Sequence, residues 1–600
     1  MSKTILSGNE AFARGAWEAG VTFAAGYPGT PSTEILENVA AHYKKDIYCE
    51  WAPNEKVAFE AAIGAAFSGA RAITTMKHVG LNVAADPLMT LSYIGTVGGF
   101  AAIVADDPGM HSSQNEQDTR RFAQFAKIPV FEPSDSQETK DFMKIALTIS
   151  ENFRTPILMR STTRVSHSRS LVEFADRQLP ERPIGFEKDP PRFVPIPAWA
   201  RAMRQRVEER LHQIQQSANL SLVNRIEWRN QNLGIVTSGM TYQYVREVFP
   251  EASVLKLGCS YPFPDELIQK FAAGVEHLLI IEELEDFLEE HIKALGIACL
   301  GKSLVPNIGE LSADVLHTVR AKLDSKISGS KEGSAALPQT AKAVSIPAER
   351  TGRPVPPSRP PVLCPGCPHR GIFFGLTKFD VVVTGDIGCY SLGVLPPLDR
   401  MDTIVCMGGG ISVAHGMDRA GEPKPVVGIV GDSTFFHSGI TGLMDIAYNK
   451  GKSTIIVLDN RTTAMTGHQE NPGTGKTLME EPTGIVSIED VGRAVGVKNI
   501  VTIDPRNMKQ IHETLKKAID SPEAWLIVAK APCPLYEKKN PGPPLELDKE
   551  KCRKCKLCLK LGCPAIEKDG DEISINRYIC AGCTLCQQTC SFGCMGEISQ

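Results

Sequence analysis

The 600-residue sequence lacks the features that mark membrane, secreted or nucleic-acid-binding proteins. No stretch approaches the ~18 uninterrupted apolar residues of a membrane-spanning helix, so no membrane partner is expected. Residues 1–9 lack the charged and apolar regions of a signal peptide. The net charge is −4 and there is no basic tail, which argues against a nucleic-acid partner. We therefore expect a cytoplasmic protein.

The chain is too long for one hydrophobic core, because single cores stop growing near ~250–300 residues. Three stretches alternate strand-like apolar runs with helical patterns, which predicts a multidomain α/β protein with doubly wound parallel sheets. The clearest predicted strands are 72–76, 101–105, 426–430 and 454–458. The predicted boundaries are 1–180, 181–232 (a Pro-rich connection with a polar helix), 233–325, 326–361 (a linker rich in Ser, Ala, Gly and Pro), 362–540 and 545–600 (a cysteine-rich tail).

Nine of the 17 cysteines lie between Cys552 and Cys594, and without a secretory signal such a cluster indicates metal rather than disulfides. The tail contains C-x2-C-x2-C twice, each time followed by a fourth cysteine, which is the arrangement of two-cluster bacterial ferredoxins. There, three thiolates of one half and one thiolate of the other half bind each cluster. The predicted [4Fe–4S] ligands are Cys552, Cys555, Cys558 and Cys590 for one cluster, and Cys580, Cys583, Cys586 and Cys563 for the other.

The tail departs from the ferredoxin pattern at two places. One extra residue precedes Cys563, and Ser591 stands where a proline usually follows the last ligand. Cys594 is left over, as an alternate ligand or an unligated thiol. The alternative to iron–sulfur is a pair of zinc sites, but these usually need only two C-x-x-C pairs with a longer insert between them. Each half of the tail instead offers three thiolates in a row.

Gly431, Asp432 and Ser433 follow one predicted buried strand, and Asn460 follows the next. This resembles the thiamine-diphosphate motif, in which G-D-G is followed by Asn after a similar interval. A diphosphate needs a divalent ion such as Mg²⁺, which demands hard oxygen ligands. Asp432 would supply a carboxylate and Asn460 an amide oxygen, and in the motif a backbone carbonyl, here that of Thr462, completes the set. The alternative is two ordinary strand-to-helix turns.

Glu55 begins a predicted Ala-rich helix, 55–68. Thiamine enzymes need a carboxylic acid beside the aminopyrimidine ring, and the pattern E-x-x-A-x5-G from Glu55 to Gly64 resembles their catalytic-glutamate helix. Burial against the cofactor would raise the pKa of this carboxyl group and suit it to proton exchange. The alternative is an ordinary partner of the helix dipole, and only the combination with the diphosphate motif favours the catalytic role.

With these motifs in place, the chain resembles the alpha subunits of indolepyruvate ferredoxin oxidoreductases over essentially its full length. The segments that carry the resemblance are GYPGTPSTE (26–34), CPGCPHR (364–370), GDIGCY (385–390), GDSTFFHSG (431–439) and LDNRTTAMTGHQ (458–469). The resemblance implies a pyrimidine-binding domain at 1–180, a transketolase-C-like domain at 233–325, a diphosphate- and Mg²⁺-binding domain at 362–540 and a ferredoxin-like module at 545–600.

The same resemblance implies an activity. A thiamine-diphosphate-dependent 2-oxoacid:ferredoxin oxidoreductase would decarboxylate aryl pyruvates such as indolepyruvate and phenylpyruvate oxidatively. Electrons would pass singly through the [4Fe–4S] clusters to ferredoxin, and coenzyme A would take the acyl group. A smaller beta subunit, in an α2β2 assembly, is expected as partner.

Further implications concern residues around the cofactor. Thr30 would contribute contacts to the cofactor and substrate pocket, and Met465 stands where pyruvate-using relatives carry Asn, which would make the pocket more apolar. Related oxidoreductases hold one more cluster near thiamine, and its ligands correspond to Cys364, Cys367, Cys389 and Cys533. The alternative for these four is partly buried thiols or a C-x-x-C redox pair.

Two other functions stay open at the level of sequence. A non-oxidative thiamine-dependent 2-oxoacid decarboxylase would explain the thiamine motif but would leave the clusters without a use. An electron-transfer subunit with a degenerate thiamine fold would explain the clusters, and Glu55 would then be replaceable without loss.

Overall fold

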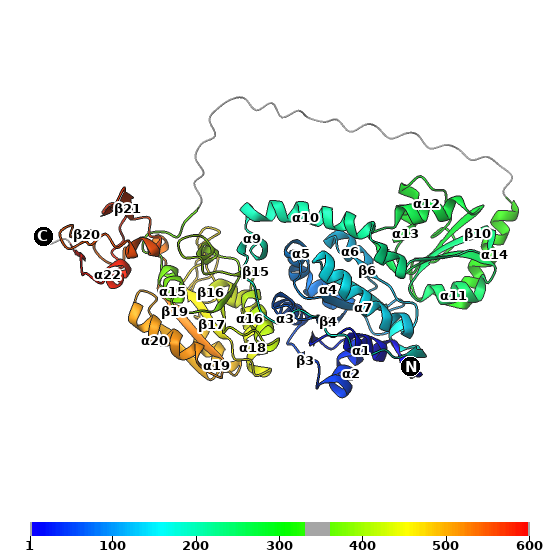
Figure 1. Cartoon of the computed structure of the whole chain (residues 1–600), viewed down its shortest axis with the longest axis horizontal. Coiled ribbons are helices and arrows are strands. Elements are labelled where there is room, and N and C mark those ends of the chain that lie inside the picture. Colours follow the sequence, from blue (N-terminus) through cyan, green and yellow to red (C-terminus); the bar gives the residue numbers. More distant parts are fainter. Residues whose placement is uncertain (1–2, 330–360, 598–600) are drawn as a thin grey trace, which may run out of the picture.

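The computed structural model describes residues 3–329 and 361–597 of the chain. Four parts follow one another along the long axis of the molecule: the second α/β domain, the first, the third and the C-terminal module (Figure 1). None of the described helices is both long enough and apolar enough to cross a membrane. Most of the predicted linker, 326–361, lies outside the described residues. Its first four residues instead belong to helix α14 (Ala313–Gly329).

The first domain contains a seven-stranded sheet in the order β12-β6-β7-β5-β4-β2-β3. Six strands are parallel, as the alternation of strand and helix patterns predicts: β2 (Phe23–Gly26), β3 (Tyr48–Trp51), β4 (Ala72–Lys77), β5 (Phe100–Asp106), β6 (Val130–Phe131) and β7 (Ile157–Thr162). The main helices around it are α1 (Gly8–Glu18), α3 (Glu55–Phe67), α5 (Ala85–Ile94), α6 (Thr119–Ala126) and α7 (Ser136–Phe153). β12 (Cys259–Tyr261) pairs antiparallel with β6. The sheet of the first domain therefore includes a strand that lies well beyond the predicted domain boundary at residue 180.

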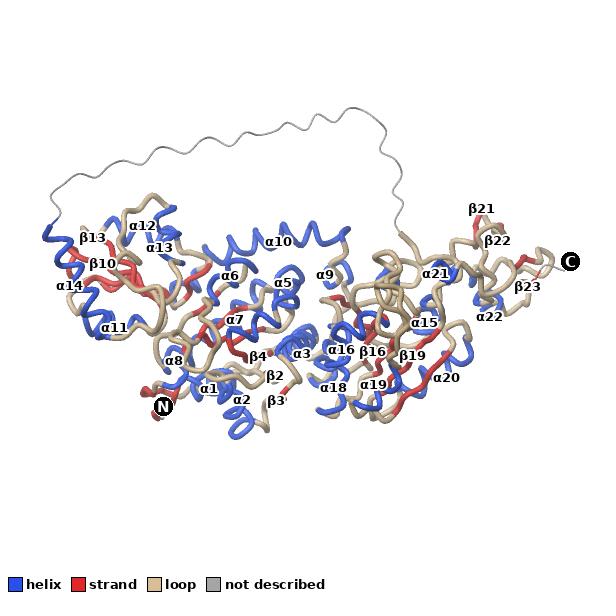
Figure 2. The backbone as a smooth tube through the Cα atoms, turned by 180° about the vertical axis from the view of Figure 1, so that it is seen from behind, coloured by secondary structure: helices blue, strands red, loops and turns tan. Residues whose placement is uncertain are grey.

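The second domain has a four-stranded sheet in the order β13-β10-β11-β9. Its strands are β9 (Arg225–Glu227), β10 (Asn230–Ser238), β11 (Ala252–Leu257) and β13 (His277–Ile281), and its helices are α11 (Thr241–Val248), α12 (Asp265–Ala273), α13 (Phe287–Ala294) and α14. β9 falls within the predicted connection 181–232. It nevertheless belongs to the sheet of the second domain, because it pairs antiparallel with β11. The predicted polar helix of that connection is α10 (Pro197–Gln215), which runs along one side of the first domain in both overall views (Figures 1 and 2).

The third domain has a six-stranded parallel sheet in the order β15-β14-β16-β17-β19-β18. Its strands are β14 (Val382–Gly385), β15 (Thr403–Ile404), β16 (Val426–Gly431), β17 (Thr454–Asp459), β18 (Asn499–Ile503) and β19 (Trp525–Lys530). Its main helices are α15 (His369–Leu376), α16 (Gly409–Arg419), α18 (Ile440–Tyr448), α19 (Ile488–Ala494) and α20 (Met508–Ile519). The C-terminal module contains the short pairs β20 (Leu545–Leu547) with β23 (Met595–Glu597), and β21 (Ile566–Asp569) with β22 (Glu572–Ile575).

The first and third domains meet where helices α3 and α16 cross. A Cβ atom placed on Gly64 would lie 2.2 Å from the carbonyl oxygen of Val413, and one placed on Gly416 would lie 1.8 Å from that of Ala61. Only glycine at these two positions lets the helix backbones approach so closely. Gly64 therefore allows α3, the helix that begins at Glu55, to pack directly against the third domain.

A buried network of ion pairs, one of which crosses between the domains, lies where the first and second domains meet. Arg120 on α6 contacts Asp118 at 2.6 Å and Glu282, which follows β13, at 2.7 Å. Arg160 on β7 contacts Asp106 at 2.6 Å, within the first domain. All five side chains are buried, so each charge depends on its partners.

Replacing Arg120 with methionine leaves Asp118 and Glu282 buried without this partner. Breaking a buried pair in this way costs about 3–5 kcal/mol, so we expect Arg120→Met to lower the midpoint of thermal unfolding. The neighbouring Arg121, whose partners Asp286 and Glu290 are exposed, provides the matched control. Arg121→Met should cost less than about 1 kcal/mol. Equal effects of the two substitutions in differential scanning calorimetry would contradict this account.

Candidate functional site

Two neighbouring parallel strands place the diphosphate motif at one edge of the third domain's sheet. Gly431 at the end of β16 lies beside Leu458 near the end of β17, so Asp432 and Asn460 leave the sheet at the same edge. Together with the Thr462 segment they line one cavity. Other residues on its wall are Ser433, Met465, His369, Cys389, Tyr390 and Met407.

The orientation of the Asn460 amide decides what this cavity can bind. One amide atom lies 2.7 Å from the carbonyl oxygen of Thr462 and 3.3 Å from Oδ1 of Asp432. With nitrogen at this position, the amide donates two hydrogen bonds. With oxygen there, three oxygen atoms converge, and the amide nitrogen faces Nε2 of His369 at 3.4 Å. Three such oxygens suit a hard divalent cation, so the residues fit Mg²⁺ in this second orientation.

Among the described residues, neither Asp432 nor Asp386 forms an ion pair with a basic side chain. Burial raises the pKa of Asp432 to about 7, and the charge of Asp459 adds to the rise. Burial also raises the pKa of Asp386 to about 8, although Asp386 accepts hydrogen bonds from the hydroxyl group of Tyr390 and from Gly408 N. A bound cation would remove the cost of burying an ionised Asp432.

Glu55 is held at the N-terminus of α3. Asn54 caps the helix by accepting a hydrogen bond from Val57 N at 3.0 Å. The Glu55 carboxyl group packs on Gly80, where an added Cβ would lie 2.6 Å from Oε1, and burial raises its pKa. Among the described residues, neither Glu55 nor Thr30 is part of the wall of the Asp432 cavity. Their roles at the cofactor stay predictions.

Lys56 connects α3 to the rim of the cavity, and the sequence motifs gave no sign of it. Its Nζ donates to the carbonyl oxygen of Met407, a cavity residue, at 2.9 Å and also forms an ion pair with Glu60. Glu60 in turn accepts a hydrogen bond from the Cys406 thiol at 3.0 Å. In the sequence, Lys56 and Glu60 are an ordinary i,i+4 pair on a helix surface. Only the contact of Lys56 with Met407 in the third domain distinguishes this pair from other helical ion pairs.

Four cysteines from three segments, Cys364, Cys367, Cys389 and Cys533, lie near one another beside the same cavity. Burial raises the pKa of Cys367 to about 12, with smaller contributions from the neighbouring thiols of Cys364 and Cys389. Burial also raises the pKa of Cys389, with contributions from Cys364 and Cys533. Cys533 N donates to the backbone carbonyl of Asn460 at 3.0 Å, which ties this group to the diphosphate motif. Their binding of a cluster stays a prediction.

The tail cysteines form two further groups. Burial raises the pKa of Cys586 to about 12, with contributions from Cys583, Cys563 and Cys580. Burial likewise raises the pKa of Cys558, with contributions from Cys555 and Cys552. Cys594 links Cys590 to the second group. The Sγ atoms of Cys590 and Cys594 lie 3.1 Å apart, and Cys594 also interacts with Cys552. The groups contain the cysteines that the spacing assigns to each cluster, with Cys594 added to one of them.

The C-terminal module is docked on the third domain through Arg370. This buried guanidinium donates to the carbonyl oxygens of Leu561 in the module at 2.7 Å and of Leu363 in the third domain at 2.6 Å. Gly366 approaches Ala581 so closely that an added Cβ would lie 2.7 Å from the alanine methyl. Cys364 and Cys367 of the third domain and Cys583 and Cys586 of the module therefore belong to one packed interface.

Two family models match the chain. Residues 14–211 match "Pyruvate flavodoxin/ferredoxin oxidoreductase, thiamine diP-bdg", and residues 386–529 match "Thiamine pyrophosphate enzyme, C-terminal TPP binding domain". The second match includes Asp432, Asn460 and Thr462. The predicted α/β sheets of the first and third domains are thus confirmed as thiamine-diphosphate-binding domains.

Curated relatives extend the match to the whole chain. Indolepyruvate oxidoreductase subunit IorA of Pyrococcus horikoshii is 40% identical, over 100% of this chain and 97% of the relative. The subunit of the same name from Thermococcus kodakarensis is 41% identical, over 98% of this chain and 96% of the relative. The 2-oxoglutarate synthase subunit KorA of Methanothermobacter thermautotrophicus is 30% identical over 32% of this chain and 53% of its own length.

Lys56→Met should destabilise the contact between α3 and the cavity rim, because it leaves Glu60 buried without its cation. The expected cost is about 3–5 kcal/mol, seen as a lower thermal midpoint. The double variant Lys56→Met/Glu60→Leu, which removes both charges, should recover most of the loss. A double variant as unstable as the single one would show that the ion pair is not the cause.

Proposed function

The chain belongs to the family of indolepyruvate oxidoreductase subunits IorA, and we propose that it decarboxylates aryl pyruvates of the indolepyruvate and phenylpyruvate type. As a 2-oxoacid:ferredoxin oxidoreductase of this family, it carries out thiamine-diphosphate-dependent oxidative decarboxylation. We propose aryl-acetyl-CoA and CO₂ as products and ferredoxin as electron acceptor. The observation that supports the proposal best is the single cavity that brings the diphosphate motif, Met465 and the Cys389 segment together.

The third domain would hold the cofactor. Asp432, the Asn460 amide and the Thr462 carbonyl would bind Mg²⁺, while the Gly431–Ser433 turn would face the diphosphate. When bound, thiamine diphosphate supplies the electron sink that allows CO₂ to leave. Met465 replaces a polar contact with an apolar wall, which suits an aryl side chain, and its side chain is 56% exposed and so accessible to substrate.

Glu55 would be the residue of this chain that transfers protons to and from the cofactor. Its carboxyl group would exchange a proton with the aminopyrimidine, and burial already raises its pKa toward the range suited to that role. Lys56, the next residue, fixes the start of α3 to Met407 on the cavity wall. In this proposal the two domains are thereby kept in register around the cofactor.

Electrons would leave along the cysteine groups. We propose a third [4Fe–4S] cluster on Cys364, Cys367, Cys389 and Cys533, beside the cavity. The Cys563, Cys580, Cys583 and Cys586 cluster would follow and the Cys552, Cys555, Cys558 and Cys590 cluster would come last. Packing of Cys583 and Cys586 against the core of the third domain supports this order. A smaller beta subunit in an α2β2 assembly, a coenzyme A site and a cytoplasmic location complete the proposal.

The proposal is tested by an anaerobic assay of the chain together with its beta partner. We expect reduction of ferredoxin or a viologen dye that requires an aryl pyruvate and coenzyme A, and that pyruvate supports poorly. Glu55→Gln should lower kcat on the order of 10²–10⁴-fold, because it removes an acid–base group. Glu37→Gln, at an exposed position of α2 (Thr33–Asn38), is the control and should leave the rate unchanged. Aldehyde release without dye reduction would instead establish the non-oxidative decarboxylase.

Iron analysis tests the cluster assignment separately. With three [4Fe–4S] clusters the anaerobically purified chain should hold about twelve iron atoms, and Cys533→Ser should reduce this by up to about four. Cys299→Ser, which removes a thiol outside the three groups, should not change the iron content. An iron content of about eight that Cys533→Ser leaves unchanged would contradict the third cluster.

A further inference from the structure

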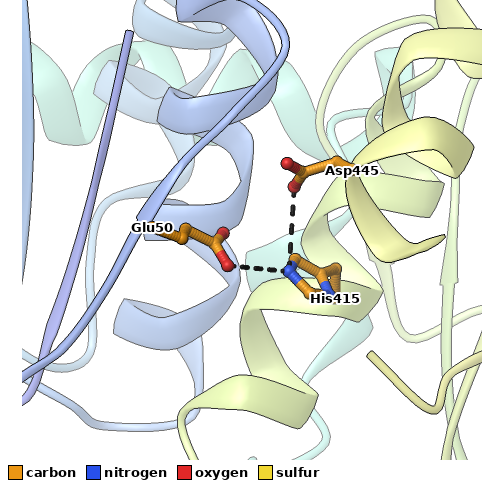
Figure 3. A group of neighbouring side chains, drawn as sticks. All are labelled: Glu50, His415 and Asp445. Carbon is orange, nitrogen blue, oxygen red and sulfur yellow. Dashed lines mark hydrogen bonds and ion pairs between the residues drawn. The ribbon is translucent and has the colours of Figure 1, made fainter. Parts of the chain in front are cut away.

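Three ionisable side chains meet in the seam between the first and third domains (Figure 3). Glu50 comes from β3, His415 from α16 and Asp445 from α18. Nε2 of His415 lies 3.0 Å from Oε2 of Glu50 and 3.7 Å from Oδ2 of Asp445. One ligand-type atom of each residue lies within 4.8 Å of the other two. Glu50 is 6% exposed and the other two side chains are fully buried.

The charges of this cluster do not balance. The imidazole carries at most one positive charge, whereas two carboxyl groups face it. In the described part of the chain, Oδ2 of Asp445 and Oε1 of Glu50 accept no hydrogen bond. Burying two carboxylates against a single imidazole is costly, because the cluster is then short of positive charge.

Neighbouring polar groups orient the two carboxylates rather than neutralise them. The Tyr48 hydroxyl donates to Oε2 of Glu50 at 2.5 Å, and the Asn449 amide donates to Oδ1 of Asp445 at 2.9 Å, which leaves Oδ2 facing the imidazole. Hydrogen bonds of this kind commonly fix the carboxylates of metal sites. The guanidinium of Arg419 stacks on the Tyr48 ring at 4.2 Å and forms no ion pair with either carboxylate within the described residues.

We propose that Glu50, His415 and Asp445 bind a divalent transition-metal ion of the zinc type, which ties the first domain to the third. Two carboxylates neutralise such an ion, and a neutral imidazole favours it over Mg²⁺ or Ca²⁺. The ion joins one ligand of the first domain to two of the third, close to the crossing of α3 and α16. It is distinct from the Asp432 cavity and from the cysteines, and its presence does not depend on the proposed activity.

The test uses the intact protein, purified anaerobically with its clusters and partner. It is incubated with Zn²⁺ in the presence of excess Mg²⁺, which occupies the Asp432 cavity, and then freed of unbound metal. We expect about one zinc per chain whose X-ray absorption shows nitrogen and oxygen neighbours at about 2.0–2.2 Å. Sulfur neighbours at about 2.3 Å would place the zinc on cysteines instead.

Matched variants assign the bound zinc to these residues. Asp445→Asn and Glu50→Gln should each weaken its binding at least tenfold and abolish the rise in thermal midpoint that Zn²⁺ causes in the unaltered protein. Asp418→Asn, on the same helix as His415 but paired with Lys452, should retain both. Absence of zinc, zinc bound through sulfur alone, or undiminished binding by Asp445→Asn would each overturn the proposal. If a variant does not fold, the X-ray absorption spectrum of zinc in the unaltered protein still shows whether nitrogen and oxygen or sulfur atoms bind the ion.

Discussion

The close crossing of helices α3 and α16 is the contact on which the arrangement of the first and third domains depends. Gly64 meets the backbone at Val413, and Gly416 meets it at Ala61, with no room for a side chain at either glycine. Because the backbones are so close, groups on both helices reach across the domain boundary. Lys56 reaches Met407 on the cavity wall, and His415 reaches Glu50 on the first sheet. A wider crossing would separate both pairs.

The buried carboxyl groups at the two boundaries of the first domain differ in the basic side chains that lie beside them. Towards the second domain, Arg120 and Arg160 are surrounded by carboxylates, and the pairs are formed within the protein itself. Towards the third domain, neither Asp432 nor Asp445 forms an ion pair with a lysine or arginine among the described residues, and burial raises the pKa of each to about 7. Burial raises the pKa of Glu283 at the first boundary to a similar value, so the two boundaries differ in their arginines and not in every carboxyl group.

The C-terminal module extends the third domain in one direction. Arg370 bridges backbone carbonyls on both sides of their interface, and Gly366 allows close contact with Ala581. Cys389 lies on the cavity wall and Cys583 and Cys586 pack against the core of the third domain, while the module itself forms the end of the molecule beyond that domain (Figure 1).

The sequence by itself determined the features that depend on short-range spacing. The strands 72–76, 101–105, 426–430 and 454–458 all lie within observed strands, and the helix predicted from Glu55 is α3. The sequence allowed us to predict that Asp432 and Asn460 lie close together. Each directly follows a strand, and neighbouring parallel strands end at the same edge of a sheet. The tail cysteines could be grouped because their ligand spacing is a local repeat.

Only the tertiary structure decided how distant segments meet. The sequence does not indicate that β12 joins the first sheet, that Lys56 contacts Met407, or that Glu50 faces His415 across a domain seam. These contacts join residues separated by more than a hundred positions, and neither helical nor strand periodicity carries information over that distance. They arise from the packing of whole domains, and in particular from two glycines whose missing side chains let two helices touch.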